Sequence, residues 1–171
     1  MSFWRHCYHI VWATKGREPI ILPAIEPRLY AYLAHKAGEL GVFLYALGGA
    51  EDHVHIVPAI PPKHSVAWVV KMLKGASAHF VNTELRPPGL HFAWQRGYGS
   101  LTIGEKQRTA AIDYVLRQKE HHQQQTTNTW LERCDDEECQ GDSDEHLHVS
   151  PDASMLRETI ADYELVLDLP W

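Results

Sequence analysis

The alternation of apolar and polar positions divides the first 125 residues into seven predicted elements. Period-two alternation, bounded by glycine or proline, indicates four β-strands: residues 4–14, 42–47, 53–60 and 92–103. Apolar positions three and four apart indicate three helices: residues 28–40, 65–85 and 105–124. Ser65 suits the N-cap of the second helix, and the pair Gly48-Gly49 is expected to end the second strand.

The resulting order, β-α-β-β-α-β-α, predicts an α+β protein. It is the ferredoxin-like split β-α-β topology, which RRM-like domains also use. We expect one antiparallel sheet with helices on one face. The last helix, residues 105–124, is additional to the basic pattern. Ile112, Val115 and Leu116 form the side of this helix that is expected to face the core.

The composition changes after residue 125, so three regions are expected along the chain. Residues 1–125 form the folded domain, whereas residues 126–150 are polar and acidic, as is typical of a flexible linker. Ser150 and Pro151 suit the start of a last helix, residues 151–171. The linker also contains four residues of types that bind zinc, at a spacing that fits no standard zinc module: Cys134, Cys139, His146 and His148.

The net charge of -6 conceals two regions of opposite sign. Residues 132–171 contain 2 basic and 13 acidic side chains, whereas residues 1–131 contain 14 basic and 9 acidic ones. A mildly basic body can contact phosphate groups, although many enzymes with polar tails share this pattern. Only three cysteines occur, no apolar run reaches the ~20 residues that span a bilayer, and no signal-peptide pattern is found. We therefore expect a cytoplasmic protein.

His53 and His55 are two residues apart in a predicted strand, so both imidazoles point to one side while Val54 points to the core. Two imidazoles directed at one point can bind a divalent metal ion. Taken alone, such a pair is more often part of an ordinary polar surface. Pro58, in the same strand, removes a backbone donor and so predicts an edge strand or a bulge.

Tyr114 lies on a polar stripe of the last helix. At ~100° per residue, Gln118 is about 40° from it on one side and His121 about 20° on the other. The apolar side of the helix does not require this tyrosine, so core packing does not explain its position. A half-buried tyrosine without a chemical role is the alternative.

These motifs occur in a fixed order: Glu51-Asp52-His53-Val54-His55, then Lys71 to Ser77, Trp94 with Gly97-Tyr98, and Tyr114-x3-Gln118-x2-His121-His122. Over about residues 8–122 the arrangement resembles the single-tyrosine transposases of the HUH class. That family includes small insertion-sequence transposases that act on single-stranded DNA. It also includes the tyrosine transposases associated with repetitive extragenic palindromes (REP).

The resemblance implies roles for the matching residues. His53, His55 and Gln118 would bind a metal ion, and Tyr114 would be the nucleophile of a 5′-phosphotyrosine intermediate. His121 and His122 either bind metal, contact DNA or form the solvated end of the helix. The resemblance also implies Mg²⁺ or Mn²⁺ as cofactor, hairpins of single-stranded DNA as substrate, and a homodimer.

Basic and aromatic residues are the candidates for further DNA contacts. Lys71, Lys74 and Arg96 either contact phosphates or are solvated surface charges. Trp12, Trp68 and Trp94 either stack on a base or pack in the core.

Two other functions remain open on the sequence alone. The first is a domesticated relative that nicks palindromes without moving itself. The second is a binding module without catalysis, since RNA-binding domains share the topology. The presence of His53, His55, Tyr114 and Gln118 together favours catalysis.

Overall fold

The computed structural model describes residues 3–85, 87–129 and 131–134. The expected order of elements is confirmed: β1 (Cys7–Ala13), α1 (Glu26–Glu39), β2 (Phe43–Gly49), β3 (His53–Ala59), α2 (Val66–Phe80), β4 (Gly99–Ile103), α3 (Arg108–Leu116) and α4 (Gln118–Gln124). Short 3₁₀ helices at Lys15–Arg17 and Glu105–Gln107 and a π-helical turn at Val81–Leu85 complete the fold. Most of the expected linker, residues 135–150, and the expected last helix, residues 151–171, lie outside the described residues.

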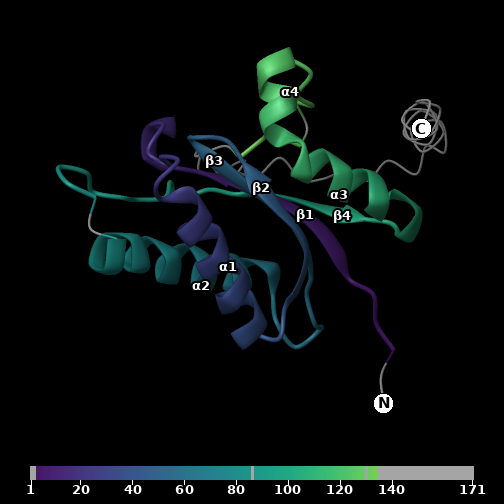
Figure 1. Cartoon of the computed structure of the whole chain (residues 1–171). Coiled ribbons are helices and arrows are strands. Elements are labelled where there is room, and N and C mark those ends of the chain that lie inside the picture. Colours follow the sequence, from purple (N-terminus) through teal and green to yellow (C-terminus); the bar gives the residue numbers. More distant parts are fainter. Residues whose placement is uncertain (1–2, 86, 130, 135–171) are drawn as a thin grey trace, which may run out of the picture. The chain divides into compact units, whose positions relative to one another are not determined.

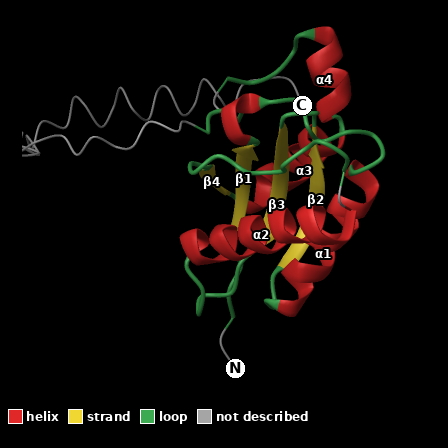
Figure 2. Cartoon of the chain, turned by 90° about the vertical axis from the view of Figure 1, so that its left-hand side faces the viewer, coloured by secondary structure: helices red, strands yellow, loops and turns green. Residues whose placement is uncertain are grey.

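The four strands form one antiparallel sheet in the order β2-β3-β1-β4. Figure 2 shows the strands side by side in this order, with α1 and α2 crossing in front of them. This strand order and the alternation of strands and helices confirm the predicted ferredoxin-like α+β fold. Within the described residues, no helix is both long and apolar enough to cross a membrane.

One face of the sheet is covered by α1 and α2, which bury the apolar core. Ile10 and Trp12 of β1 and Val54 and Ile56 of β3 point to this face. They pack with residues from the two helices: Leu29, Leu33, Ala37, Val69, Val70 and Leu73. Ser65 is the N-cap of α2 as predicted, because its side chain accepts a hydrogen bond from the Trp68 amide at 3.2 Å.

The opposite face of the sheet is covered as well, by α3, so the expectation of helices on one face only is wrong (Figure 1). Val115 of α3 is buried against Ala46 of β2 and Val57 of β3. Ile112 packs on the edge of this cluster, but Leu116 is 62% exposed, contrary to the prediction that it faces the core. Leu116 is the last residue of α3, and the chain leaves the helical conformation at Arg117.

Gly48 explains how α3 approaches the sheet so closely. The second strand does not end before the glycine pair, as predicted, but continues through Gly49. A Cβ atom on Gly48 would lie 2.1 Å from the carbonyl oxygen of Val115. Only a glycine therefore leaves room for the α3 backbone, and the glycine pair serves packing and not chain reversal.

Several boundaries differ from the prediction for physical reasons. β4 begins at Gly99, because Phe92 and Trp94 are held against the core by an irregular segment that pairs only through a bridge between Thr14 and Trp94. α1 begins at Glu26, since a proline is accepted in the first turn of a helix. The predicted last helix is broken at Arg117 into α3 and α4.

Pro58 lies in an inner strand, and the predicted bulge is found opposite it. Leu44 of β2 pairs with Pro58, whereas Ala46 pairs with Val57, so Tyr45 is the extra residue. The bulge accommodates the proline, which has no amide hydrogen to donate.

Candidate metal and tyrosine site

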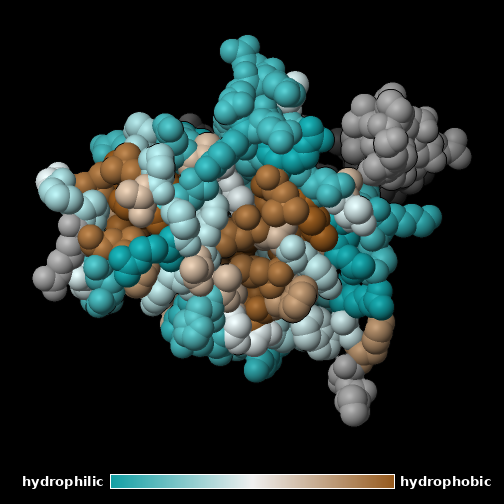
Figure 3. Space-filling model, viewed as in Figure 1, coloured by the Kyte–Doolittle hydropathy of each residue, from teal (hydrophilic) through white to brown (hydrophobic). Residues whose placement is uncertain are grey.

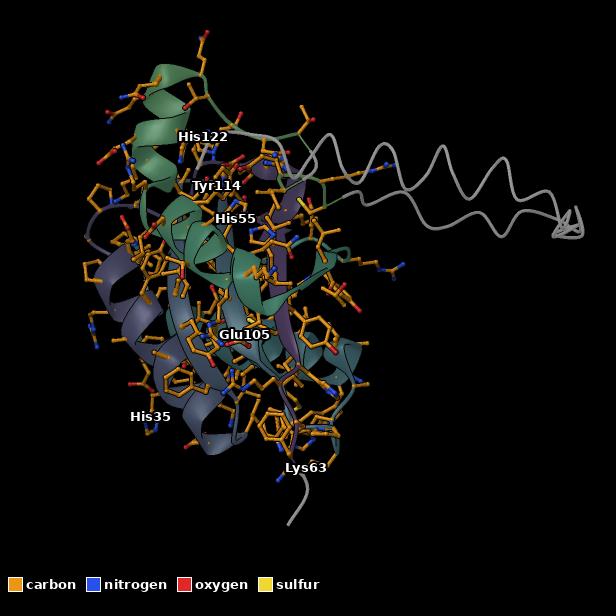
Figure 4. All side chains as sticks on the ribbon, turned by 90° about the vertical axis from the view of Figure 1, so that its right-hand side faces the viewer. His35, His55, Lys63, Glu105, Tyr114 and His122 are labelled. Atoms are coloured by element: carbon orange, nitrogen blue, oxygen red, sulfur yellow. The ribbon has the colours of Figure 1, made fainter. Side chains whose placement is uncertain are left out.

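The two histidines of β3 lie in the middle of the sheet, on the face covered by α3. His53 and His55 are fully buried, and Val54 between them points to the apolar core. Figure 4 shows His55, Tyr114 and His122 together where α3 meets α4, whereas His35 and Lys63 lie at the other end of the molecule. The site is thus formed between the sheet and the layer of α3 and α4.

His53 is oriented by Asp52, which sequence reasoning did not assign. The Nδ1 atom of His53 lies 2.6 Å from Oδ1 of Asp52, and Arg17 contacts the other carboxylate oxygen at 3.2 Å. Burial opposes ionisation of Asp52, but the hydrogen bonds from His53 and Arg17 lower its pKa. Because an ionised carboxylate only accepts, Nδ1 of His53 donates to it, and Nε2 is the ring nitrogen that faces Glu132 and His122 and could bind a metal ion.

His55 is oriented in a similar way by His9 of β1. The Nδ1 atom of His55 lies 2.9 Å from Nε2 of His9. Burial and the neighbouring His55 lower the pKa of His9 to about 3, and burial also lowers the pKa of His55. Both rings are therefore neutral near pH 7, and Nδ1 of His55 can donate a hydrogen bond to Nε2 of His9. This leaves Nε2 of His55 for a ligand, as metal binding requires.

Tyr114 of α3 faces the same point as the two histidines. Its hydroxyl donates to Oε1 of Glu132 at 2.5 Å and accepts from the Asn128 amide at 3.1 Å. Burial, followed by the hydrogen bond to Glu132, raises the pKa of Tyr114 to about 12. The ring stacks on His121, with 4.8 Å between the centroids. The tyrosine is fixed in position but is fully protonated in this environment.

Gln118 lies at the start of α4 and is only 1% exposed. Its Nε2 atom contacts Oε1 of Glu132 at 3.3 Å, but its buried Oε1 atom has no hydrogen-bond partner among the described residues. A buried acceptor without a partner costs about 1–3 kcal/mol. A bound cation would satisfy this oxygen, so the donor set of Gln118 and the two imidazoles fits a metal ion.

The structure separates the two histidines that the sequence left ambiguous. His122 places its Nε2 atom 3.2 Å from Nε2 of His53, within the cluster. His121 stacks on Tyr114, and its Nδ1 atom contacts the Thr126 hydroxyl at 3.0 Å. His122 is therefore placed to join the ligand group, and His121 supports the tyrosine ring.

Glu132 is the central residue that sequence reasoning missed. Its Oε2 atom lies 3.3 Å from Nε2 of His53, 3.2 Å from Nε2 of His55 and 3.8 Å from Nε2 of His122. Ligand atoms of His53, His122 and Glu132 all lie within 4.8 Å of one another. Glu132 belongs to the region expected to be a linker, and no spacing in the sequence distinguishes it from the acidic residues that follow.

Residues 131–134 pack on the sheet instead of forming the start of a linker. Cys134 is buried against Val11 and Ala13, and its carbonyl oxygen accepts a hydrogen bond from the Gln95 side chain. Arg17 donates to the carbonyl oxygen of Glu132 at 3.2 Å and to the Cys134 sulfur at 3.1 Å. Of the four predicted zinc-binding types, Cys134 has this packing role, and the other three lie outside the described residues.

The predicted DNA-contacting residues are not brought to this site. Lys71 and Lys74 belong to α2, which covers the opposite face of the sheet. The amino group of Lys74 donates to the carbonyl oxygens of Arg96 at 2.9 Å and Gly97 at 2.8 Å. Lys74 therefore holds the segment that leads into β4.

The tryptophans divide between core and surface. Trp12 is fully buried, and Trp94 packs on the core while its indole donates to Ser77 at 2.9 Å. Trp68 is 38% exposed and stacks on His64. Of the three candidates for base stacking, only Trp68 presents a substantially accessible ring.

A histidine pair on an inner strand of a ferredoxin-like sheet, facing a tyrosine on an added helix, is the arrangement of the single-tyrosine HUH transposases. The chain belongs to the IS200-like transposase family, whose model matches residues 2–118. His122 and Glu132 lie beyond the matched residues.

Individual relatives agree with this assignment. The chain is 29% identical over 115 residues to the ISDra2 transposase TnpA of Deinococcus radiodurans, covering 65% of this chain and 82% of that protein. It is 31% identical over 123 residues to the transposase for insertion sequence element IS200 of Salmonella typhimurium, covering 68% of this chain and 79% of that protein.

Two solved structures share the fold. One is a protein from Deinococcus radiodurans R1 described as a transposase, with a TM-score of 0.54 and 32% identity over 68% of this chain and 93% of that one. The other is a REP-associated tyrosine transposase bound to a REP hairpin, with a TM-score of 0.55 over 76% of each chain. At 14% identity, the second similarity concerns the fold alone.

Proposed function

We propose that this transposase cleaves and rejoins single-stranded DNA, with Tyr114 as nucleophile and a divalent metal ion held by His53, His55 and Gln118. One observation carries the proposal. The Tyr114 hydroxyl, the Gln118 amide and both histidine Nε2 atoms lie within 3.3 Å of the same carboxylate, that of Glu132. A nucleophile and three possible metal ligands from β3, α3 and α4 thus converge on one point.

The donor set supports Mg²⁺ or Mn²⁺ as the cofactor. Gln118 supplies a neutral oxygen, which both ions accept, and two neutral imidazoles are tolerated better by Mn²⁺. When bound, such an ion polarises the phosphate oxygens and offsets the negative charge that develops during attack.

The proposed chemical step transfers a phosphate of the DNA to the Tyr114 oxygen. The Tyr114 oxygen attacks the phosphorus, the bond from phosphorus to the 3′ oxygen breaks, and the phenolic proton ends on that oxygen as a free 3′-OH. The DNA remains attached as a 5′-phosphotyrosine. Attack by another 3′-OH reverses the step, joins two strands and restores the phenol. Stacking on His121 holds the tyrosine ring during both steps.

A hairpin of single-stranded DNA is the proposed substrate, and a homodimer the proposed assembly. The solved relative bound to a REP hairpin supports the first point. The edge strand β2 supports the second, because it exposes Phe43 by 62% and Tyr45 by 37%. Figure 3 shows apolar residues gathered in the middle of the face on which β2 lies.

The test is a denaturing gel of the full chain with labelled hairpins drawn from the DNA that flanks its gene, with Mn²⁺ or Mg²⁺. A covalent protein–DNA band is expected with the native protein and with Tyr32→Phe, a control on α1, where Tyr32 stacks on Phe80. The band should disappear with Tyr114→Phe or without metal. Hairpins that bind but give no covalent band with any of these proteins would instead support a binding module.

A further inference from the structure

Glu132 lies outside the residues that the family model matches, yet it occupies the centre of the site. We propose that Glu132 is a ligand of the metal ion and binds it through Oε2. The inference rests on the proposed metal site of His53, His55 and Gln118, and it adds an anionic ligand to that site.

The distances around Oε2 are those of neighbouring ligands. Oxygen and nitrogen ligands lie about 2.0–2.2 Å from a small divalent ion, so adjacent ligand atoms lie about 3 Å apart. Oε2 lies 3.2 Å from Nε2 of His55 and 3.3 Å from Nε2 of His53. The His122 nitrogen lies 3.2 Å from that of His53 and 3.8 Å from Oε2. Small side-chain shifts would place one cation among these atoms.

The charges of the site also favour this role. The imidazole nitrogens and the Gln118 amide bring no negative charge to a cation, whereas Glu132 places a carboxylate oxygen 3.2 Å from Nε2 of His55 and 3.3 Å from Nε2 of His53. The Glu132 side chain is only 16% exposed, and a carboxylate largely removed from water is costly unless a positive charge compensates it. A divalent cation supplies that charge, and small hard cations prefer carboxylate oxygens.

Contacts of the backbone of Glu132 and of the neighbouring Cys134 hold this segment in place. Arg17 holds the Glu132 carbonyl oxygen, and the same arginine holds Asp52 behind His53. Cys134, two residues further on, is buried against β1 and accepts from Gln95. Arg17 therefore connects the Glu132 segment with Asp52, the residue that orients His53.

The second carboxylate oxygen gives Glu132 a further effect. Oε1 accepts the hydrogen bond of the Tyr114 hydroxyl at 2.5 Å and also contacts Gln118 at 3.3 Å. With Oε2 on the metal ion, the same carboxylate holds the nucleophile beside the ion. Glu132 is thus a ligand and a positioning residue for Tyr114.

The experiment measures Mn²⁺ binding to the full chain by calorimetry in the absence of DNA. Glu132→Gln removes the charge and keeps the shape, and His53→Ala removes a ligand of the metal site proposed above. The matched control is Glu120→Gln, since Glu120 is exposed and pairs with Arg117. Thermal unfolding of each variant without metal checks that it folds. If Glu132→Gln does not fold, Glu132→Asp replaces it, because the shorter side chain withdraws the ligand atom.

We expect the Kd for Mn²⁺ to rise at least about tenfold in Glu132→Gln and to stay unchanged in Glu120→Gln. If Glu132→Gln, or Glu132→Asp in its place, binds like the native protein while His53→Ala does not, the inference about Glu132 is overturned and the metal site stands. Tighter binding by the variant overturns it too, since the carboxylate would then block the ion. If the native protein binds no Mn²⁺, the proposed metal site itself fails.

Discussion

The two faces of the sheet are built from the same strands but from different chemistry. Along β3, Val54 and Ile56 face α1 and α2, whereas His53 and His55 face α3. Along β1, Ile10 and Trp12 join the first face and His9 the second. Both faces are buried, so burial alone does not distinguish the apolar face from the polar one.

The two faces differ in the kind of side chain that they bury. The face under α1 and α2 buries apolar side chains, whose removal from water stabilises the fold. The face under α3 and α4 buries imidazoles, a carboxylate and an amide, which need specific partners. We therefore expect substitutions on the first face to change stability, and substitutions on the second to change ligand binding.

The largest effect is expected from Trp12→Ala on the apolar face. Trp12 is fully buried among apolar residues, and truncating a buried aromatic side chain costs about 3–5 kcal/mol. Urea denaturation followed by circular dichroism measures the loss of unfolding free energy. The control Trp68→Ala, at a position that is 38% exposed, should lose less than about 1 kcal/mol. Equal losses would show that the apolar face is not the main source of stability.

A smaller effect is expected from His9→Ala, and on a different property. His9 contacts the Nδ1 atom of His55, and removing the partner of a metal-binding histidine weakens metal affinity about 10- to 100-fold. Calorimetry with Mn²⁺ measures the Kd, with His6→Ala at an exposed position of the same chain end as control. An unchanged Kd in a folded His9→Ala protein would contradict the role of the polar face.

The smallest effect is expected where the two layers meet. Lys119 of α4 pairs with Glu26 of α1 at 2.6 Å, and the lysine is 61% exposed. An exposed ion pair contributes about 0–1 kcal/mol, so Lys119→Met should change the unfolding free energy by no more than that. A double-mutant cycle with Glu26→Gln isolates the pair. A coupling well above 1 kcal/mol would mean that the layers stabilise each other through this contact.

The sequence predicts the apolar face better than the polar one. Period-two alternation is a local signal, and it identifies Ile10, Trp12 and Val54 as core residues because their neighbours point the other way. The same alternation predicts that His53 and His55 share a side. It does not show that His9 lies behind His55, because that contact depends on how β1 pairs with β3.

Contacts made by the chain after α4 could not be predicted at all. Glu132 lies in a polar, acidic stretch that follows Gln125, the residue that ends α4 in a left-handed conformation with φ 55°. The sequence also does not predict the break between α3 and α4 at Arg117, because the residue pattern of one long helix continues across it. The prediction that the glycine pair ends the second strand was also wrong, since Gly48 is required by a tertiary contact with α3 and not by a turn.

The strand order has a consequence for the motions of the site. β1 and β3, which carry the three buried histidines, are the inner strands, and each is hydrogen-bonded on both sides. Backbone amides of such strands exchange with solvent only through large openings, whereas amides of a peripheral helical layer exchange through smaller ones. Hydrogen exchange should therefore be slowest around the histidines and faster in α4, so that the helix with Gln118 and His122 can move while the strands beneath it stay rigid.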